Sequence, residues 1–292
     1  MKILVTGYNG QLGFDVIKEL NSRSIECKGV DREDFDITNR EETVDYICGY
    51  APDAVVHCAA YTAVDRAEDD EENCRKVNVD GTENIAIACE RLGARMLYVS
   101  TDYVYGGAGE KPFETTDPTD PKNVYGRTKL DGEKAVMRHL DRFFIVRTSW
   151  VFGINGNNFV KTMLRLGSEK DGLNVVCDQI GSPTYTPDLA RLICDLIVTD
   201  KYGIYHGTNE NYCSWAEFAA EIMKLGGRKA KINPVASSEY PVKAERPHNS
   251  RMSKKCLDDA GIKRLPTWQD ALNRFLKELG ELNEINSCCS LL

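Results

Sequence analysis

Tyr125 and Lys129 form a pair of side chains that can act together on a carbonyl group. They lie four residues apart, which is about one turn of a helix, so a phenol and an ammonium at this spacing project from the same face. A tyrosine has an ordinary pKa of about 10 and keeps its proton at neutral pH, and a neighbouring cation stabilises the phenolate left after proton transfer. The pair therefore suits reduction of a ketone, in which a developing alkoxide takes up the proton. Exposed Tyr and Lys residues at this spacing are common. The elements around the pair must therefore show whether it is functional.

A glycine-rich segment near the N-terminus predicts a bound dinucleotide. The apolar run 2–6 is typical of a strand, and Gly7, Gly10 and Gly13 follow it. Such glycines permit a tight turn, let backbone N–H groups approach a pyrophosphate, and allow the next helix to pack closely on the strand. Their G-x-x-G-x-x-G spacing is one residue wider than the commonest fingerprint, so the preceding strand and a downstream acid become the deciding features.

The acid follows a second predicted strand, 25–30, where Asp31 lies 18 residues after the last of these glycines. Its carboxylate can accept hydrogen bonds from the adenosine ribose, and it would repel a 2′-phosphate, which favours NADH. Arg32 comes next and offers such a phosphate a charge-assisted contact, so the choice between NADH and NADPH stays open. Asp36 and Ile37 are candidates to cap the adenine, and the alternative is that Asp36 begins the next helix.

Length and composition fit a cytoplasmic enzyme better than a nucleic-acid-binding or membrane protein. The chain has 292 residues, 42% of them hydrophobic, and a net charge of -8. We find no basic stripe with interleaved aromatics and no apolar run near the roughly 18 residues of a membrane span. Eleven cysteines without a C-x-x-C pair are expected to be reduced thiols. Cys289-Ser290-Leu291-Leu292 fits a prenylation box, but an acidic stretch precedes it, so we interpret the match as coincidence.

Strand-like and helix-like segments alternate through the first half of the chain. Predicted strands at 53–57, 95–100 and 143–148 enclose a long predicted helix near 71–92 and the helix that carries Tyr125. This alternation predicts an α/β fold, a doubly wound, Rossmann-like parallel sheet with a smaller C-terminal α/β lobe. Ligands collect at the carboxyl ends of such strands. The predicted crevice is bordered by Gly7, Asp31, Cys58-Ala59-Ala60 and Ser100-Thr101-Asp102.

The alternation weakens after residue 150, which predicts a second lobe. Residues 1–150 are expected to form the dinucleotide-binding domain and residues 151–292 mainly the substrate-binding lobe. Segments of 173–206 are candidates to return to the first domain, and the tail after about 280 is a candidate for disorder. His206 follows a strand-like run and is expected to be a hydrogen-bonded structural residue rather than a catalyst.

Several longer blocks of sequence carry a family likeness. They are residues 5–13, 59–68, 100–105, 123–129, 147–151, 157–163, 178–184 and 246–251. Together they resemble the extended short-chain dehydrogenase/reductase family, over nearly the whole chain up to about residue 276. The A-Y-T-A-V-D, S-T-D-Y-V-Y and R-T-S-W blocks resemble the subgroup that reduces dTDP-linked ketosugars. The nucleotide-sugar epimerases share only the fold, the glycines and the Tyr/Lys pair.

The resemblance implies reduction of the C4 ketone of dTDP-4-dehydro-L-rhamnose to dTDP-L-rhamnose by NADPH or NADH. Carried over by position, it makes Tyr125 the general acid, Lys129 the residue that lowers the pKa of Tyr125 and holds the nicotinamide ribose, and Thr101 a donor to the carbonyl oxygen. Donors already aimed at that oxygen stabilise the transition state more than the ground state. The implied coenzyme contacts are Gly7, Asn9, Gly10, Gln11, Leu12, Gly13, Asp31, Arg32, Asp36, Ile37, Ala59, Ala60, Tyr61, Asn78, Tyr125 and Lys129, and the implied substrate contacts are Thr62, Val64, Thr101, Asp102, Tyr125, Trp150, Asn158 and Arg246.

Three of these expectations have explicit alternatives. Trp150 is expected to form an apolar wall beside the methyl face of the deoxysugar, or else an ordinary aromatic contact between lobes. Arg246 and Arg251 are candidates to clamp the diphosphate, or else a solvated pair. Some members of the subgroup are dimers bridged by a divalent cation. Asp15 and Asp188 are the matching candidates for Mg²⁺, but they are shorter than the expected Glu, so metal dependence and the choice between monomer and homodimer stay open.

Two other functions also stay open. One is a different reductase or epimerase of nucleotide sugars, and the other is a regulatory subunit that binds a dinucleotide and a partner enzyme without catalysis. A non-catalytic subunit would be expected to lose members of the catalytic set. Thr101, Tyr125 and Lys129 are all present, which favours an enzyme.

Overall fold

A six-stranded parallel sheet forms the centre of the first lobe in the computed structural model, which describes residues 1–289 and their side chains through Gly280. Its order is β10-β5-β4-β3-β1-β2. The strands are β1 (Lys2–Thr6), β2 (Glu26–Val30), β3 (Ala54–His57), β4 (Arg95–Thr101), β5 (Phe143–Thr148) and β10 (Gly203–His206). The order reverses between β1 and β3, the place where open α/β sheets bind ligands. The predicted fold class is confirmed.

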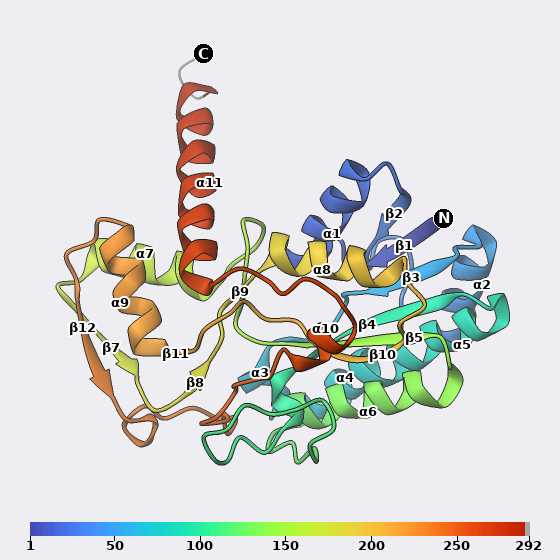
Figure 1. The fold of residues 1–292 in the computed structure, drawn as a ribbon, viewed down its shortest axis with the longest axis horizontal. Helices are drawn as coiled ribbons and strands as arrows, with labels where there is room; N and C mark the ends of the chain where they lie inside the picture. The colour runs from blue at the N-terminus through green and yellow to red at the C-terminus, as the bar shows by residue number, and fades with distance from the viewer. Residues whose placement is uncertain (290–292) are drawn as a thin grey trace.

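Helices cover both faces of this sheet (Figure 1). They are α1 (Gln11–Ser22), α2 (Arg40–Tyr50), α5 (Thr82–Leu92), α6 (Val124–His139) and α8 (Thr186–Ile197). Helices α1 and α8 pack together and bury one core, to which Ile3 and Val5 contribute, whereas Leu4 of the same strand belongs to the core on the other side. All three side chains are fully buried. A strand covered on both faces needs apolar residues at successive positions, which explains the run in β1.

The helix expected at 71–92 is interrupted in the structure. It consists of α4 (Glu71–Arg75), a six-residue π-helix (Lys76–Gly81) and α5. The π-helix carries the buried Asn78, whose side-chain amide accepts a hydrogen bond from the backbone N–H of Tyr61 (2.8 Å) and donates one to its carbonyl (3.2 Å). Wider turns of this kind are frequent at functional sites. Here the turn fixes the backbone that follows β3.

The second lobe has its own core, centred on Phe152, Phe218 and Phe275. Its elements are α7 (Phe159–Glu169), α9 (Trp215–Leu225), α11 (Trp268–Cys289) and the parallel pair β7 (Gly172–Val176) and β12 (Lys231–Val235). Helix α9 begins with a capping box between Ser214 and Glu217, a device that satisfies the first backbone N–H groups of a helix. Helix α11 packs its first turns on this core and then extends away from the body (Figure 1).

Short strands and shared segments connect the two lobes. After β6 (Val151–Phe152) the chain builds α7 and β7, and then β8 (Ile180–Gly181) and β9 (Thr184–Tyr185) lead back to the first lobe. β9 pairs with β6, and β8 pairs with β11 (Cys213–Ser214). Helix α8 and strand β10 follow β9, so residues 186–206 lie with the central sheet. Two shorter helices, α3 (Val64–Ala67) and α10 (Lys255–Asp259), complete the regular elements that matter for the site.

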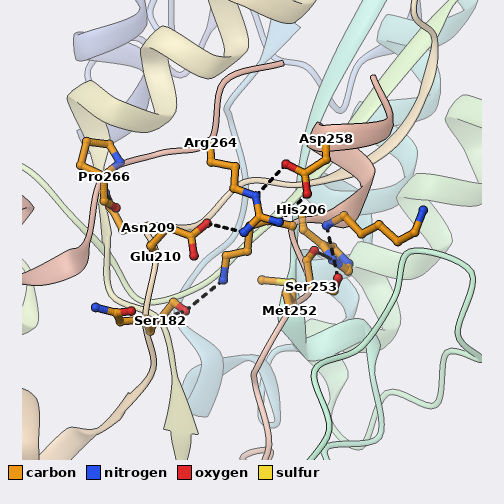
Figure 2. Close-up of polar contacts among 12 residues, drawn as sticks. Ser182, His206, Asn209, Glu210, Met252, Ser253, Asp258, Arg264 and Pro266 are labelled. Atoms are coloured by element: carbon orange, nitrogen blue, oxygen red, sulfur yellow. Dashed lines mark hydrogen bonds and ion pairs between the residues drawn. The ribbon is translucent and has the colours of Figure 1, made fainter. Parts of the chain in front are cut away.

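The segment after β12 returns to the first lobe and is held there by ion pairs (Figure 2). Figure 2 shows Arg264 between Asp258 and Glu210, with Nε of Arg264 2.8 Å from Asp258 Oδ1 and Nη1 3.2 Å from Glu210 Oε1. Both carboxylates are partly exposed, and exposed ion pairs contribute little to stability. Their effect is on geometry, because they fix the chain between α10 and α11.

His206 joins the same segment to the central sheet. Its ring is fully buried, and burial lowers its pKa to about 3, so the imidazole is neutral. Nδ1 lies 2.8 Å from the Ser253 carbonyl oxygen and must donate to it, so Nε2 accepts from the Tyr105 hydroxyl, 2.7 Å away. Both ring nitrogens are therefore used in the fold, in agreement with the structural role predicted for His206.

Cysteines and membrane segments add little to the functional argument. The cysteines at positions 27, 48, 58, 74, 89, 177, 194, 213 and 256 are free thiols. Over the described part of the chain, no helix is both long enough and apolar enough to cross a bilayer. The prenylation-like tail cannot be compared with the structure, because residues 290–292 lie outside the described range.

Candidate active site

The three predicted catalytic residues are brought together where β4 ends and α6 begins. Thr101 is the last residue of β4. Helix α6 starts after Asn123, whose side chain accepts a hydrogen bond from Gly126 N (2.8 Å). A Cβ atom on Gly126 would lie only 2.3 Å from the Tyr103 carbonyl oxygen. The missing side chain lets α6 approach the end of β4, and Tyr125 thereby reaches Thr101.

Tyr125 is a half-buried phenol that keeps its proton. It is hydrogen-bonded to the Thr101 side chain, and its ring meets the Tyr103 ring edge-on with centroids 5.6 Å apart. Burial raises the pKa of Tyr125 well above its usual value, the Asp102 carboxylate raises it further, and the Thr101 hydroxyl opposes both effects. Such a phenol releases its proton only to a strong base, and an alkoxide formed beside it is one.

Lys129 is buried one helical turn after Tyr125, with 2% of its surface exposed. Its ammonium donates to the Val99 carbonyl oxygen (2.8 Å) and lies 4.0 Å from the centroid of the Tyr98 ring. Burial lowers the pKa of Lys129 to about 7, while the Glu133 carboxylate and two nearby thiols act in the opposite direction. The residue is therefore poised between its charged and neutral forms at neutral pH.

The Lys129 pKa predicts that activity decreases on the alkaline side of neutrality. A lysine is cationic below its pKa and neutral above it, so the fraction of protein with a Lys129 ammonium falls as the pH rises through about 7. We expect kcat/KM to fall about tenfold per pH unit beyond this point, because it reports the free enzyme's essential groups. The measurement is a kcat/KM profile between about pH 6 and 9. A profile that stays flat to the alkaline end would contradict the assignment.

Asp102 presents a carboxylate next to the Thr101 hydroxyl. Its Oδ1 accepts from Thr101 Oγ1 at 3.0 Å. Burial raises the pKa of Asp102 to about 6, although the hydroxyls of Ser250 and Thr101 lower it. Among the described side chains, none makes a hydrogen bond of good geometry to Oδ2, although Ser250 lies near. A buried acceptor without a well-formed bond is costly, and a hydroxyl of a bound sugar would satisfy it.

Trp150 adds a strained aromatic wall to the same region. Its φ angle is +51°, a left-handed conformation that costs energy for any residue with a bulky side chain. The ring stacks on Trp215 with centroids 3.6 Å apart, and a Cβ on Gly181 would come within 2.9 Å of it. Strain of this kind persists only where the surroundings hold it, and here the Trp215 ring and the backbone of Gly181 do so.

The glycine loop has the geometry of a dinucleotide cradle. Gly7 has a φ of +70°, and a Cβ on it would lie 2.7 Å from Ala59 N. Gly10 is the residue before α1, and no side chain caps that helix. The first N–H groups of α1 are therefore free to bind an anion, and the helix dipole favours a negative charge at this end. The predicted contacts Asn9, Gln11, Leu12 and Gly13 belong to this loop and first turn.

Asp31 lies beside that loop at the end of β2. Its carboxylate accepts from Asn9 N (3.3 Å) and Arg32 N (2.9 Å). Asp36 accepts from both the backbone N–H and the hydroxyl of Thr38, at 2.9 and 2.8 Å. It therefore closes a turn before α2, and the capping residue of α2 is Asn39. These contacts favour the alternative, in which Asp36 belongs to the start of the next helical region, over a contact with the adenine.

Several other predicted residues are already engaged within the protein. Asn158 caps α7 through Lys161 N (3.1 Å), and its amide donates to Gln11 Oε1 (3.1 Å) and Gly153 O (2.8 Å). The side-chain amide of Asn78 is hydrogen-bonded to the backbone of Tyr61, as described above. Ile37 packs on the π-helix, since a Cβ on Gly81 would lie 2.9 Å from its side chain. The remaining predicted contacts Ala59, Ala60, Thr62 and Val64 follow β3 directly or begin α3.

Arg246 is paired with an acid, and it also interacts with Tyr103, whose ring contacts Tyr125. It donates to both oxygens of Asp65, at 3.1 and 2.6 Å. Asp65 also accepts from the backbone N–H of Ala244 (3.1 Å), so the pair ties the segment near 244 to α3. A diphosphate would have to compete with Asp65 for this guanidinium. Arg251 donates to Asn249 Oδ1 at 3.0 Å, within its own segment.

The two metal candidates do not form a metal site. Asp15 Oδ2 accepts from Thr186 Oγ1 at 2.5 Å, and Asp188 Oδ2 accepts from Asn209 (2.8 Å) and Arg274 (2.7 Å). Asp188 thus already has a cationic partner. Among the described residues, no group of three or more His, Cys, Asp or Glu side chains is arranged to hold a metal ion. The described contacts within one chain therefore give no support for a bound Mg²⁺, and we assign it no role.

Three residues near the site were missed from the sequence. Glu133 lies on the catalytic face of α6, Trp215 stacks on Trp150, and Ser250 approaches Asp102. Glu133 carried a usable signal, because it lies one helical turn after Lys129. Trp215 and Ser250 had none, since their places depend on contacts between segments far apart in the chain.

Known proteins match this chain over nearly its whole length. The family described as RmlD substrate binding domain matches residues 1–281. The spore coat polysaccharide biosynthesis protein SpsK of Bacillus subtilis (strain 168) is 40% identical, covering 95% of this chain and 97% of the relative. The dTDP-4-dehydrorhamnose reductase of Escherichia coli (strain K12) is 38% identical, covering 96% and 98%. The solved structure of dTDP-4-dehydrorhamnose reductase from Bacillus anthracis in complex with NADP is 41% identical, with a TM-score of 0.93, covering 95% of this chain and 100% of that one.

Proposed function

The chain belongs to the RmlD substrate binding domain family, and we propose that it reduces the C4 ketone of dTDP-4-dehydro-L-rhamnose to dTDP-L-rhamnose with NADPH or NADH. The observation that carries the proposal is the convergence of Thr101, Tyr125 and Lys129 at the edge of the sheet where the glycine loop lies. The names of the relatives agree with it, since they include dTDP-4-dehydrorhamnose reductases of similar length.

The proposed chemistry follows from what each side chain holds. NADPH or NADH, when bound, would supply a hydride to the ketone carbon, and negative charge would develop on the ketone oxygen. Tyr125 would then give its phenolic proton to that oxygen. The Thr101 hydroxyl donates to Asp102 Oδ1 in the structure and would turn to donate its hydrogen bond to the ketone oxygen instead. Lys129 stabilises the phenolate that remains. Donors that are in place before charge develops lower the barrier without reorganisation.

Substrate binding is proposed to use the groups that the fold leaves unsatisfied or apolar around this centre. Asp102 Oδ2 is the buried acceptor that a sugar hydroxyl would fill. The stacked rings of Trp150 and Trp215 offer an apolar wall to the methyl group of a 6-deoxysugar. Thr62 and Val64, just after β3, are proposed to complete the pocket.

The coenzyme is proposed to lie over the glycine loop, with its pyrophosphate at the start of α1 and its adenosine ribose at Asp31. Asp31 is suited to ribose hydroxyls, while Arg32 is the side chain that would accept a 2′-phosphate. The Bacillus anthracis relative was solved with NADP, which supports use of NADPH. Comparing the two coenzymes in one assay decides between them.

The experiment that tests the function is a coupled absorbance assay with the dTDP-linked ketosugar. Consumption of NADPH or NADH at 340 nm, together with formation of dTDP-L-rhamnose, is the expected result. The main alternative is a different nucleotide-sugar substrate, so UDP- and GDP-linked ketosugars belong in the same panel. Turnover of one of these and none of the dTDP-linked sugar would reject the proposed substrate. Tight coenzyme binding without turnover of any sugar would support the regulatory subunit instead.

A further inference from the structure

We infer that Glu133 is a positioning residue of this active site, whose carboxylate holds the end of β4, with Thr101, against the helix that carries Tyr125 and Lys129. The inference rests on the proposed reductase function for its catalytic consequence. Glu133 is fully buried, with 0% of its surface exposed. It lies four residues after Lys129 on α6, so both side chains share one face of the helix.

Glu133 contacts the end of β4 directly. Ser100 donates its hydroxyl hydrogen to Glu133 Oε1 at 2.5 Å. Ser100 immediately precedes Thr101 in the chain. The hydrogen bond therefore acts one residue away from the catalytic hydroxyl on one side and one helical turn away from the ammonium on the other. Bonds to an ionised carboxylate are short and strong, so this contact can set the spacing of the two catalytic elements.

Arg147 of β5 donates hydrogen bonds to both oxygens of the Glu133 carboxylate. Nε and Nη2 of Arg147 donate to Oε1 and Oε2 of Glu133 at 2.9 and 2.7 Å. Arg147 is itself held by the Tyr105 hydroxyl, 2.7 Å from Nη1. Ser100 and Arg147 are also paired residues in the register of β4 and β5. Three elements, β4, β5 and α6, thus meet at a single ionised side chain.

Glu133 and Arg147 form a buried ion pair at this position. Well-packed apolar residues of similar volume often stabilise a fold as well as a buried ion pair does or better. Stability alone therefore does not account for two buried charges beneath the catalytic helix. A directional carboxylate does account for them, because it fixes the distance and rotation between β4 and α6, and because it places a negative charge near Lys129.

Glu133 also affects the charge state of Lys129. The groups that face its ammonium are the Val99 carbonyl and the Tyr98 ring from β4, Cys58 after β3, Cys74 of α4, and Glu133 of its own helix. His57 also feels this charge, but with a pKa of about 3 it is neutral. Burial lowers the pKa of Lys129, and the Glu133 carboxylate is the first of the groups that raise it. Removing the Glu133 charge should therefore reduce the fraction of ammonium at neutral pH.

The test is Glu133→Gln, which keeps the size of the side chain and an amide oxygen for Ser100 but removes the charge. We expect kcat to fall about 10- to 100-fold, as small misplacements of catalytic groups do, with KM for the nucleotide sugar within about twofold of wild type. We also expect the alkaline limb of kcat/KM to move to lower pH. A purely structural role would leave that limb in place.

Asp188→Asn is the matched control, because Asp188 is also a buried carboxylate paired with an arginine, Arg274 at 2.7 Å. It makes no hydrogen bond to Thr101, Tyr125 or Lys129 and is expected to leave kcat and the pH profile unchanged. If Glu133→Gln fails to fold because Arg147 is left unpaired, the double variant Glu133→Gln/Arg147→Met removes both charges and carries the same expectations.

A second readout separates this inference from the proposed function. Binding of NADPH, followed by its fluorescence across the same pH range, reports the Lys129 ammonium without any sugar substrate. The midpoint of the pH dependence should be lower in the Glu133→Gln protein or the double variant than in wild type. Coinciding midpoints, or an unchanged kcat in a folded variant, would overturn the inference. The wild-type protein could fail to reduce the dTDP-linked sugar while the variants show the expected shift of the midpoint. That result would overturn only the proposed substrate.

Discussion

Tyr125→Phe is expected to lower kcat by about 10²- to 10⁴-fold, the range ascribed to general acid catalysis. Phenylalanine keeps the ring that packs edge-on against Tyr103, so the local packing should survive. What it removes is the proton that the half-buried phenol retains because its pKa is raised. Water would have to replace Tyr125 as the donor, without the orientation that Thr101 and α6 provide. The measurement is steady-state reduction of the dTDP-linked ketosugar.

The control for this prediction must lose a tyrosine hydroxyl elsewhere. Tyr46 lies in α2, with its ring stacked on Phe35 at a centroid distance of 4.5 Å, and Tyr46→Phe is expected to leave kcat within about twofold because surface and peripheral substitutions usually have small effects. The Kd for NADPH should be nearly unchanged in the Tyr125 variant. A Tyr125→Phe protein that retains most of its kcat would show that another group supplies the proton.

The strands of the first lobe were predictable because a buried strand is recognisable in the sequence as a run of apolar residues. The run 2–6 coincides with β1, and the run 143–148 coincides with β5. Strands covered on both faces need continuous apolar residues, and such runs can be recognised without knowing what packs on them. The helix expected over 71–92 was interrupted by a π-helix. That feature has no comparable trace, because the extra backbone residue is accommodated by long-range contacts such as those of Asn78 with Tyr61.

The centre of the site was predictable for a related reason. Thr101 ends β4 and Tyr125 lies in the first turn of α6, and the carboxyl ends of parallel strands share one edge of the sheet. The rim of the site was not predictable in the same way. The pairing of Arg246 with Asp65 joins residues 181 positions apart, and the stack of Trp150 on Trp215 joins two segments that are far apart in the chain. Local pattern does not contain this information.

Trp150 illustrates why the rim resists prediction from sequence. Its left-handed backbone is unfavourable for a tryptophan considered alone, so a propensity argument would place a glycine there. The conformation is held by partners in β8 and α9, at Gly181 and Trp215. Local sequence rules fail most often where a fold tolerates strain for the sake of a site.

Gly13→Ala is expected to abolish coenzyme binding within the accessible concentration range. A Cβ on Gly13 would lie 2.2 Å from the carbonyl oxygen of Gly7 and 2.8 Å from Cα of Tyr8. These are backbone atoms of the coenzyme loop, so relief requires α1 or the loop itself to move. Overpacking of this kind typically costs about 1–3 kcal/mol of stability. The displaced loop would in addition lose the alignment of the first N–H groups of α1 with the pyrophosphate.

Gly49→Ala is the matched control for this change. Gly49 also lies in a helix, α2, and a Cβ there would meet nothing within 4 Å. Alanine is favoured over glycine in helix interiors by about 0.5–1 kcal/mol, so this variant should be slightly more stable than wild type and bind NADPH equally well. Fluorescence titration with NADPH and thermal unfolding of both variants provide the comparison. A Gly13→Ala protein with wild-type affinity would mean that the coenzyme does not depend on the close approach of α1 to this loop.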